Sequence, residues 1–333
     1  MEFFTHIDIA PSADQVDHRQ RLMLLGSCFS DSMGARLARD KFQVMANPFG
    51  TLYNPASIAA QLLRCVSEEE FPSNHGAFLR DERSGRWLSW LHHGSVWGAT
   101  ADELAAEVNR RMHQAAQWLR QADWLMLTFG SAYVFQLAES GLVVANCHKQ
   151  DGRRFLHKRL SAWEIEDMWV PVVQLLRSVN PRLKFLFTVS PIRHKGDGLH
   201  QNQLSKSELL LATDALCAKM GDCCRYFPAY ELLLDELRDY RFYGPDLLHP
   251  SQQAEDYVYE RFCQAFVSEE ERRLSERCRA VNSALNHRPT DEQSAEYQAF
   301  LKKTLNQIEE LKGDCPCLDF DAEEKLCNTK LRK

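Results

Sequence analysis

Residues 21–30, RLMLLGSCFS, join an apolar run to a turn of small residues, and they indicate the class of fold most directly. The four apolar residues at 22–25 are typical of a strand that is buried on both faces. Gly26, Ser27 and Cys28 follow at once, and apolar residues at helical spacing come after them. A short buried strand that leads into a helix is the recurring element of an α/β fold with a mainly parallel sheet.

Short apolar runs of the same kind recur along the chain and alternate with segments of helical period. Residues 124–129 (WLMLTF) and 183–189 (LKFLFTV) read as buried strands, and the weaker run at 225–227 reads as a fourth. Capping boxes, in which a hydroxyl and a later glutamate satisfy free N–H groups, predict three helix starts: Thr100 with Glu103, Ser161 with Glu164, and Ser205 with Glu208. The alternation predicts helices that cover a mainly parallel sheet.

Two segments depart from this alternation. Residues 71–98 predict an irregular or hairpin-like insertion that is expected to border the ligand pocket. Its aromatic faces would suit a sugar ring or an acyl chain, although tryptophans are more often simply part of a core: Trp87, Trp90 and Trp97. From residue 268 the composition becomes charged and helical, with a break at 287–289, so 1–267 is expected to form the main domain and 268–333 a helical C-terminal extension. The extension ends in a polar tail that is expected to be poorly ordered. It is compatible with packing on the main domain or in a homodimer.

The overall composition is that of a soluble globular protein. Of the 333 residues, 44% are hydrophobic and 26% are charged, and the formal net charge is −6. Because phosphate binding needs clustered Lys and Arg, which this chain lacks, the composition argues against nucleic acid and anionic membranes as partners. No apolar run approaches the ~18–20 residues of a membrane span. Small molecules or proteins remain as partners.

The eleven cysteines cannot all pair with one another within one chain, because their number is odd. The first residues lack the basic-then-apolar pattern of a secretory signal, so we expect free thiols in a reducing cytoplasm. The cysteine spacings show no repeated CxxC pair of the kind that binds zinc, and the pair His92 and His93 lacks a ligand motif nearby. The sequence therefore predicts neither a metal nor a cofactor.

The turn after the first predicted strand carries two side chains that can act as nucleophiles, Ser27 and Cys28. In an open parallel sheet, ligands bind beyond the carboxyl ends of the strands, where this turn is expected to lie. At a helix start, free N–H groups and the positive helix end lower the pKa of a thiol or stabilise an oxyanion. A turn of small residues that only packs tightly explains the segment equally well.

A second candidate is the loop at 243–250, YGPDLLHP, which leads into a predicted helix. Asp246 and His249 can point the same way from one turn, so that the carboxylate holds the imidazole in one tautomer while the other nitrogen faces a nucleophile. Taken alone, an Asp-x-x-His before a helix is more often a helix cap. Together with Ser27 and Cys28, it indicates nucleophilic catalysis.

Five short motifs occur in order along the chain: 26–29 (GSCF), 49–50 (FG), 146–149 (NCHK), 239–243 (DYRFY) and 246–250 (DLLHP). By these motifs the chain, from about residue 3 to the C-terminal helices, resembles the GSCFA family, which is related to the SGNH or GDSL-like hydrolases. The resemblance implies a flavodoxin-like, three-layer α/β/α core. It also suggests ester or acyl hydrolysis.

The resemblance implies roles for four residues. The SGNH pattern places its nucleophile at the third position of Gly-Asp-Ser, which is Cys28 here, while Ser27 stands at the aspartate position. Three readings follow: Cys28 is a thiol nucleophile, Ser27 takes the role through a shifted turn, or this branch has lost ordinary serine chemistry. Asp246 and His249 match the Asp-x-x-His block without change, which implies that His249 is the general base and that Asp246 orients it.

The resemblance assigns the oxyanion donors less completely. Gly50 matches the glycine of the second SGNH block, and its N–H is expected to hold the oxyanion together with that of Cys28. Gly130 stands where the third block begins, but the asparagine of that block is missing. Losing one oxyanion donor typically costs ~3–4 kcal/mol of transition-state stabilisation, so a working enzyme needs a replacement. Asn146 is the candidate, and a role as a turn or capping amide explains it equally well.

Four further residues are candidates for binding an anionic group of the substrate, although such residues more often form a solvated rim: His148, Lys149, Arg193 and His194. The predicted function is an SGNH-type ester or acyl hydrolase that acts on a small molecule, with carbohydrate and lipid substrates both left open. Two alternatives remain. One is an acyltransferase that uses the same residues, and the other is a non-catalytic binding or scaffold descendant of the fold.

Overall fold

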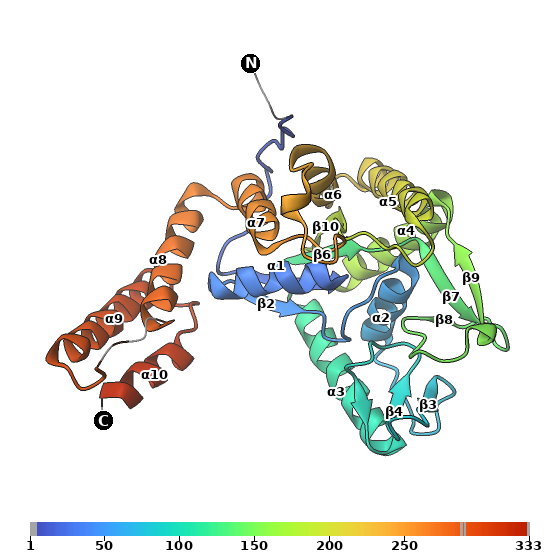
Figure 1. Cartoon of the computed structure of the whole chain (residues 1–333), viewed down its shortest axis with the longest axis horizontal. Helices are drawn as coiled ribbons and strands as arrows, with labels where there is room; N and C mark the ends of the chain where they lie inside the picture. Colours follow the sequence, from blue (N-terminus) through green and yellow to red (C-terminus); the bar gives the residue numbers. More distant parts are fainter. Residues whose placement is uncertain (1–4, 287–288, 290, 332–333) are drawn as a thin grey trace. The chain divides into compact units, whose positions relative to one another are not determined.

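A five-stranded sheet organises the α/β part of the computed structural model, which describes residues 5–286, 289 and 291–331 (Figure 1). The strands are β1 Arg21–Gly26, β2 Gln43–Ala46, β6 Trp124–Phe129, β10 Lys184–Val189 and β11 Cys224–Tyr226. Their order across the sheet is β11-β10-β6-β1-β2, and β1, β6, β10 and β11 pair in parallel. Counted along the chain, this order is 2-1-3-4-5, which is that of flavodoxin-like folds. The predicted α/β fold is confirmed, although the sequence patterns do not predict β2.

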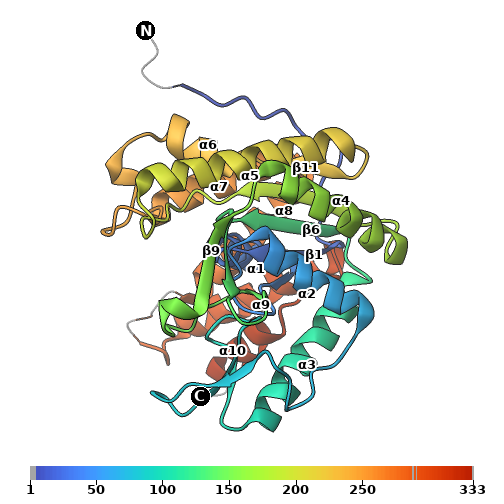
Figure 2. The same cartoon turned by 90° about the vertical axis from the view of Figure 1, so that its right-hand side faces the viewer.

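Helices alternate with these strands along the chain: α1 Cys28–Arg39, α2 Pro55–Ser67, α3 Ala101–Leu119, α4 Ala162–Val179, α5 Leu199–Lys219, α6 Ala229–Glu231 and α7 Gln252–Phe266. Leu25, Leu127 and Phe187 are paired neighbours on adjacent strands, and they share one apolar core with α2, α3, α4 and α5. Figure 2 shows α4 and α5 side by side. On the opposite face, Ser30 of α1 donates a hydrogen bond to the Thr128 hydroxyl of β6 (2.8 Å). The predicted three-layer α/β/α arrangement is thus confirmed.

Two small antiparallel sheets interrupt the alternation of strands and helices. The first makes up much of the predicted insertion at 71–98: β3 Phe78–Arg80, β4 Trp87–Ser89 and β5 Trp97–Gly98. The second is one that the sequence patterns do not predict: β7 Tyr133–Leu137, β8 Val143–Val144 and β9 Phe155–Arg159. The chain also contains three short helical turns among its described residues. A 3₁₀ turn precedes β9 at Gly152–Arg154, and a π-helical turn at Leu232–Glu236 and a 3₁₀ turn at Tyr240–Phe242 follow α6.

Two of the three predicted helix starts are confirmed. The hydroxyls of Thr100 and Ser161 cap α3 and α4 by accepting hydrogen bonds from the backbone N–H groups of Glu103 and Glu164. The third prediction is wrong, because Ser205 and Glu208 lie inside α5. The Ser205 hydroxyl accepts a hydrogen bond from the Ala132 N–H (2.8 Å), and the Glu208 carboxylate accepts the first N–H of α4 (2.8 Å). These side chains therefore accept hydrogen bonds from N–H groups of other segments. Only their spacing in the sequence resembles that of a capping box.

The chain divides into two compact units. The first comprises Met1–Asp8, Leu22–Gly34 and Met45–Val258, and the second comprises Ile9–Arg21, Ala35–Val44 and Tyr259–Lys333. The helices of the second unit include α8 Glu269–Asn286, α9 Ala295–Asp314 and α10 Asp321–Leu331. The domain boundary expected between 267 and 268 stays a prediction, and residues 287 and 288 of the expected break lie outside the described residues. Within the described chain, we find no helix with the length and apolar character that a bilayer crossing requires.

The described part of the C-terminal tail is helical from Asp321 to Leu331, which corrects the expectation of a poorly ordered tail for these residues. Cys327 of α10 packs in one apolar cluster with Tyr297 and Leu301 of α9. Leu318 and Phe320, which come just before α10, are buried in another cluster. A tail with a polar average composition is ordered here because a few apolar side chains at suitable spacing are buried.

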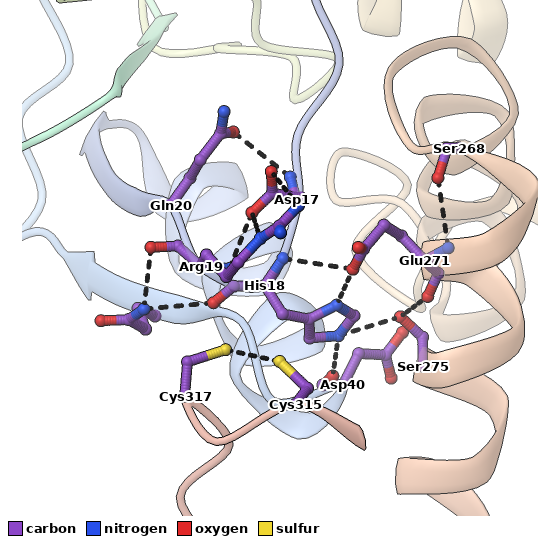
Figure 3. Close-up of polar contacts among 11 residues, drawn as sticks. Asp17, His18, Arg19, Gln20, Asp40, Ser268, Glu271, Ser275, Cys315 and Cys317 are labelled. Carbon is purple, nitrogen blue, oxygen red and sulfur yellow. Dashed lines mark hydrogen bonds and ion pairs between the residues drawn. The ribbon is translucent and has the colours of Figure 1, made fainter. Parts of the chain in front are cut away.

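A buried histidine links distant segments of the second unit (Figure 3). The His18 imidazole pairs with the Glu271 carboxylate through Nδ1 and with the Asp40 carbonyl oxygen through Nε2 (3.0 Å), and its ring stacks on Phe42. Both ring nitrogens have partners and the residue is 1% exposed, so we interpret it as a structural histidine. No group of three His, Cys, Asp or Glu side chains within the described ranges is placed to hold a metal ion.

Candidate active site

A cavity of about 800 Å³ opens beyond the carboxyl ends of β1, β6 and β10. Ser27 and Cys28 follow β1 in its lining, Ser131 follows β6, and His194 follows β10. His249 joins them from the loop before α7. The strands β1 and β6 flank the point where the strand order reverses, which is the usual position of a ligand in this fold. Candidate residues from the start and the end of the α/β part therefore meet in one cavity.

The turn between β1 and α1 depends on a glycine and an asparagine. Gly26 has a φ of +146°, and a Cβ atom on it would lie 2.2 Å from the Thr128 carbonyl oxygen, so only glycine fits. Its N–H donates to Asn47 Oδ1 (2.9 Å), and Asn47 Nδ2 donates to Asp31 Oδ1 (2.8 Å). Asn47 is a residue that the sequence reasoning missed, and it ties the turn to the segment after β2.

Ser27 and Cys28 differ in what surrounds their side chains. Ser27 is 1% exposed, and its hydroxyl donates to Ser190 Oγ (3.0 Å) and accepts from the Phe29 N–H (3.3 Å). Cys28 is half-buried at the first position of α1, and no side chain among the described residues forms a hydrogen bond with its sulfur, which has only backbone N–H groups of the turn as partners. The Ser27 hydroxyl is thus engaged by another side chain, whereas Cys28 lines the cavity without a side-chain partner for its sulfur.

The protonation of Cys28 is set by its surroundings. Burial raises the pKa of the Cys28 thiol above its ordinary value, and the negative charges of Asp31 and Glu255 raise it further. The N–H groups at the start of α1 act in the opposite direction. Because the net effect is a raised pKa, this cysteine is a neutral thiol at neutral pH and needs a base to become a nucleophile.

Asp246 and His249 form a close pair in the loop before α7. Asp246 Oδ2 lies 2.6 Å from His249 Nδ1, and Asp246 Oδ1 accepts hydrogen bonds from the N–H groups of Leu248 and His249, at 3.0 Å each. These hydrogen bonds, led by that from Leu248, hold the pKa of the Asp246 carboxyl well below its usual range. The carboxylate therefore fixes a proton on Nδ1 of His249, which leaves Nε2 as the basic nitrogen.

The same loop decides against the simple helix-cap interpretation of Asp246. The helix α7 begins at Gln252, and the hydroxyl that accepts from its first turn belongs to Ser251 (3.3 Å from the Ala254 N–H). Asp246 accepts instead from N–H groups of its own loop. Its carboxylate thus orients His249 without capping the helix.

The expected oxyanion donors divide into two groups. The Gly50 N–H donates to the Asn47 carbonyl oxygen (2.8 Å), and the Gly130 N–H donates to that of Tyr53 (2.8 Å), so neither is free for a ligand. Asn146 lines the cavity; its Oδ1 accepts from the His148 N–H (2.8 Å), and its Nδ2 lacks a partner in the described chain. The structure therefore does not support Gly50 and Gly130 as donors, and it leaves Asn146 available.

Three of the four residues expected to bind substrate line the cavity: Lys149, Arg193 and His194. His148 does not, because its imidazole is buried and its Nε2 pairs with the Ser89 carbonyl oxygen (2.8 Å). Burial also lowers the pKa of His148, so this residue is neutral at pH 7, and it lies outside the cavity lining. Burial lowers the pKa of His194 to about 4, which makes it a neutral hydrogen-bonding group at pH 7. The expectation for His148 is thus corrected.

One wall of the cavity is aromatic, and the sequence reasoning missed it. Tyr133 and Phe135 of β7 both stack on His157 of β9, with ring centroids 4.6 Å and 4.2 Å apart. The aromatic and β-branched residues at 133–135 (YVF) are a strand signal that could have revealed this wall.

The expectation that the insertion at 71–98 borders the pocket is wrong, and the alternative that its tryptophans belong to a core holds for two of them. The cavity lining found in the described chain includes none of them: Trp87, Trp90 and Trp97. Trp87 and Trp90 instead pack in two separate apolar clusters. A large aromatic side chain in a small sheet has an apolar core of its own to fill, and sequence does not distinguish that from a pocket wall.

Two family models match the chain. The one described as "GSCFA family" matches residues 21–262, and the one described as "GSCFA domain protein, C-terminal domain" matches residues 278–333. No curated protein matches the chain.

Two solved structures are similar to the chain at low identity. One is a Corynascus thermopiles (Myceliophthora fergusii) carbohydrate esterase family 2 enzyme with a carbohydrate-binding domain, with 12% identity, a TM-score of 0.38, and coverage of 77% of this chain and 67% of that one. The other is an acetyl xylan esterase from the rumen bacterium Butyrivibrio proteoclasticus, with 10% identity, a TM-score of 0.36, and coverage of 75% and 63%.

Proposed function

The chain belongs to the GSCFA family, and we propose that it is an ester or acyl hydrolase of the SGNH type that uses Cys28 as its nucleophile. The observation that carries this proposal is that Cys28 and His249 line one cavity, with His249 held by Asp246. A nucleophile, a base and a residue that orients the base are the three parts that covalent acyl chemistry requires.

In the proposed reaction, His249 Nε2 takes the proton of Cys28 as the sulfur attacks the acyl carbonyl carbon. The oxyanion of the tetrahedral intermediate accepts hydrogen bonds from the Cys28 N–H and from Asn146 Nδ2. The intermediate collapses to a thioester, and the leaving alcohol takes the proton from His249. Water, activated by the same imidazole, then attacks the thioester, which releases the acid and restores the thiol.

An acyl acceptor in place of water makes the same residues an acyltransferase, since both reactions share the thioester. The non-catalytic alternative is favoured by one observation. No hydrogen bond joins the Cys28 sulfur to His249 among the described residues, although such contacts are often loose before a substrate binds. The proposal therefore depends on whether Cys28 becomes acylated.

Acylation is tested by mixing the chain with p-nitrophenyl acetate and locating the acetyl group by peptide mass spectrometry. We expect one fast adduct on Cys28, lost in Cys28→Ala and strongly slowed in His249→Ala. Cys147 supplies the matched control, because it lines the same cavity but burial raises its pKa to about 11, so Cys147→Ala should leave the adduct unchanged. An adduct on Ser27 would move the nucleophile to that residue. A folded chain that acquires no adduct with any activated ester would instead identify a non-catalytic descendant.

We further propose that the substrate carries an anionic group. Lys149, Arg193 and Lys195 bring three positive charges to the cavity. The described lining holds one acidic side chain against them, Asp197, whose carboxylate lies 3.6 Å from His157 Nδ1. This positive lining belongs to a chain whose net charge is −6, so it does not follow from the overall composition. Charge-assisted hydrogen bonds to an anion contribute roughly 1.5–3 kcal/mol each at most.

Replacing both Lys149 and Lys195 with alanine should raise KM for a negatively charged ester, such as a succinyl ester, by about tenfold. KM for the matching acetyl ester should change much less, because the acetyl group carries no negative charge for these two lysines to bind. The measurement is the ratio of the two KM values. Arg153→Ala is the control, since this exposed arginine pairs with Asp151 and is not part of the lining. An equal change in both KM values would contradict the anionic substrate.

A further inference from the structure

A buried lysine, Lys206, lies close to the turn that carries Ser27 and Cys28. Lys206 of α5 is 1% exposed, and its Nζ donates to the carbonyl oxygens of Gly130 (2.6 Å) and Ser190 (2.7 Å). No carboxylate pairs with it among the described residues. Lysine is almost never fully buried unless it is paired, so this side chain requires an explanation beyond packing.

The two carbonyl groups connect Lys206 to the candidate active site. Gly130 directly follows β6 and Ser190 directly follows β10, so both lie at the edge of the sheet where the cavity opens. Ser190 Oγ accepts the hydrogen bond of Ser27, whose own Oγ accepts from the Phe29 N–H. Contacts therefore lead from Lys206 to Ser190 and then to Ser27 and Phe29. These last two residues flank Cys28 in the sequence.

Among the described residues, three titratable groups face the Lys206 ammonium. They are Cys28 of α1, His194 of the loop after β10, and Tyr230 of α6, whose ring centroid lies 5.8 Å from Nζ. Burial lowers the pKa of Lys206 to about 7, and the charge of Cys28 acts to raise it. Burial keeps His194 neutral above about pH 4 and raises the pKa of Tyr230. Of these three groups, Cys28 is the one that proposed catalysis turns into an anion.

We propose that Lys206 is a positioning residue whose ammonium group stabilises the Cys28 thiolate from beneath the ends of β6 and β10. This inference rests on the proposed role of Cys28. The proton of Cys28 still passes to His249 Nε2, and Lys206 keeps its own proton and forms no bond to the substrate. The ammonium acts through its charge in a site of low polarity, where the attraction between opposite charges is stronger than in water.

A purely structural role predicts something different. A lysine that only holds two carbonyl groups can be replaced by another hydrogen-bond donor, with an effect on stability but none on the ionisation of Cys28. A lysine that acts through its charge affects Cys28 only while it is protonated. Since the pKa of Lys206 is about 7, its effect should be present below neutral pH and disappear above it.

The test is the rate of alkylation of Cys28 by iodoacetamide, which follows the thiolate population, in the native chain and in Lys206→Met and Lys206→Gln. Both variants remove the charge, and glutamine keeps a hydrogen-bond donor. We expect Cys28 in both variants to react about tenfold more slowly than in the native chain at pH 6, which corresponds to a shift of about one pKa unit. At pH 9 the rates should converge, because the native Lys206 is then neutral as well.

Cys147 serves as an internal control in the same peptide maps, since it lines the cavity and its pKa is raised by burial alone. His249 is common to all three chains, so its own titration cancels in the rate ratio. Thermal unfolding of each variant verifies that it is folded. A rate ratio near one at pH 6 in a folded variant, or a ratio that does not change with pH, would overturn the proposal.

A second measurement covers the case in which neither Lys206 variant folds. Cys28→Asp places a lasting negative charge at the turn, and Cys28→Asn is its neutral isostere. We expect the pKa of Lys206, followed by NMR of ¹³Cε-labelled lysine, to be about one unit higher with the aspartate. An equal pKa of Lys206 in the two variants would contradict the proposal.

Neither readout needs ester turnover, so the proposed function and the role of Lys206 can fail separately. If the alkylation ratio depends on pH but no ester is turned over, Lys206 still tunes Cys28, and the hydrolase proposal alone is lost.

Discussion

Cys28→Ala is expected to lower kcat for ester hydrolysis by about 10⁴-fold or more, because removing a catalytic nucleophile leaves only binding and oxyanion stabilisation. Ser27→Ala should keep most of the activity. The Ser27 hydroxyl is buried and shared between Ser190 and the Phe29 N–H, so it is not directed at a substrate in the cavity. Steady-state kinetics of both variants with one activated ester provides the measurement.

Loss of the Ser27 hydroxyl should instead appear in stability. Removing one buried hydrogen-bonding partner typically costs ~1–3 kcal/mol, since Ser190 and the Phe29 N–H would be left less satisfied. Denaturant unfolding of Ser27→Ala measures this cost, and Cys28→Ala serves as the comparison. The opposite pattern, with turnover lost in a folded Ser27→Ala and kept in Cys28→Ala, would show that the serine is the nucleophile.

Asp246→Asn is expected to lower kcat by about 10³–10⁴-fold with little change in the fold. The carboxylate accepts from His249 Nδ1 at 2.6 Å and so keeps Nε2 free of a proton. An amide can donate to Nδ1, which favours the opposite tautomer and leaves no base beside Cys28. The measurement is kcat together with the pH dependence of kcat/KM.

Asp239→Asn is the matched control for this variant. Asp239 is also an aspartate in a turn, where its carboxylate accepts from the Arg241 N–H (3.0 Å), but it is not in the cavity lining. Because the pKa of Asp246 is held below its usual range, its charge remains as pH falls through the ordinary range of aspartate. The native pH profile should therefore show no inflection there, and an Asp246→Asn variant with native kcat would exclude the pair from catalysis.

Much of the α/β core could be predicted from local patterns. The runs at 22–25 and 124–129 are strands because consecutive apolar residues bounded by turn residues have few other stable arrangements. The loop with Asp246 and His249 could be recognised for a similar reason. Its two side chains are three residues apart, so one turn is enough to bring them together.

Features that depend on distant residues could not be predicted in this way. The Ser27 hydroxyl is engaged by Ser190, which is 163 positions away in the chain. The N–H groups of Gly50 and Gly130 are occupied by carbonyl groups that sequence does not place near them. Lys206 lies within a false capping box, whose hydroxyl and carboxylate serve other segments.

By itself, the sequence determined the class of fold, the positions of four of its main strands along the chain, and two short segments with the residue types of acyl chemistry. Each of these is a matter of spacing between near neighbours, which the periods of strands and helices set. The tertiary structure alone decided that the two segments share a cavity and that Ser27, rather than Cys28, is paired with another side chain. It also placed Lys206, which has carbonyl partners but no carboxylate partner among the described residues, close to the turn with Ser27 and Cys28. Burial and hydrogen-bond partners decide these points, and both arise only when strands far apart in the chain end at the same edge of the sheet.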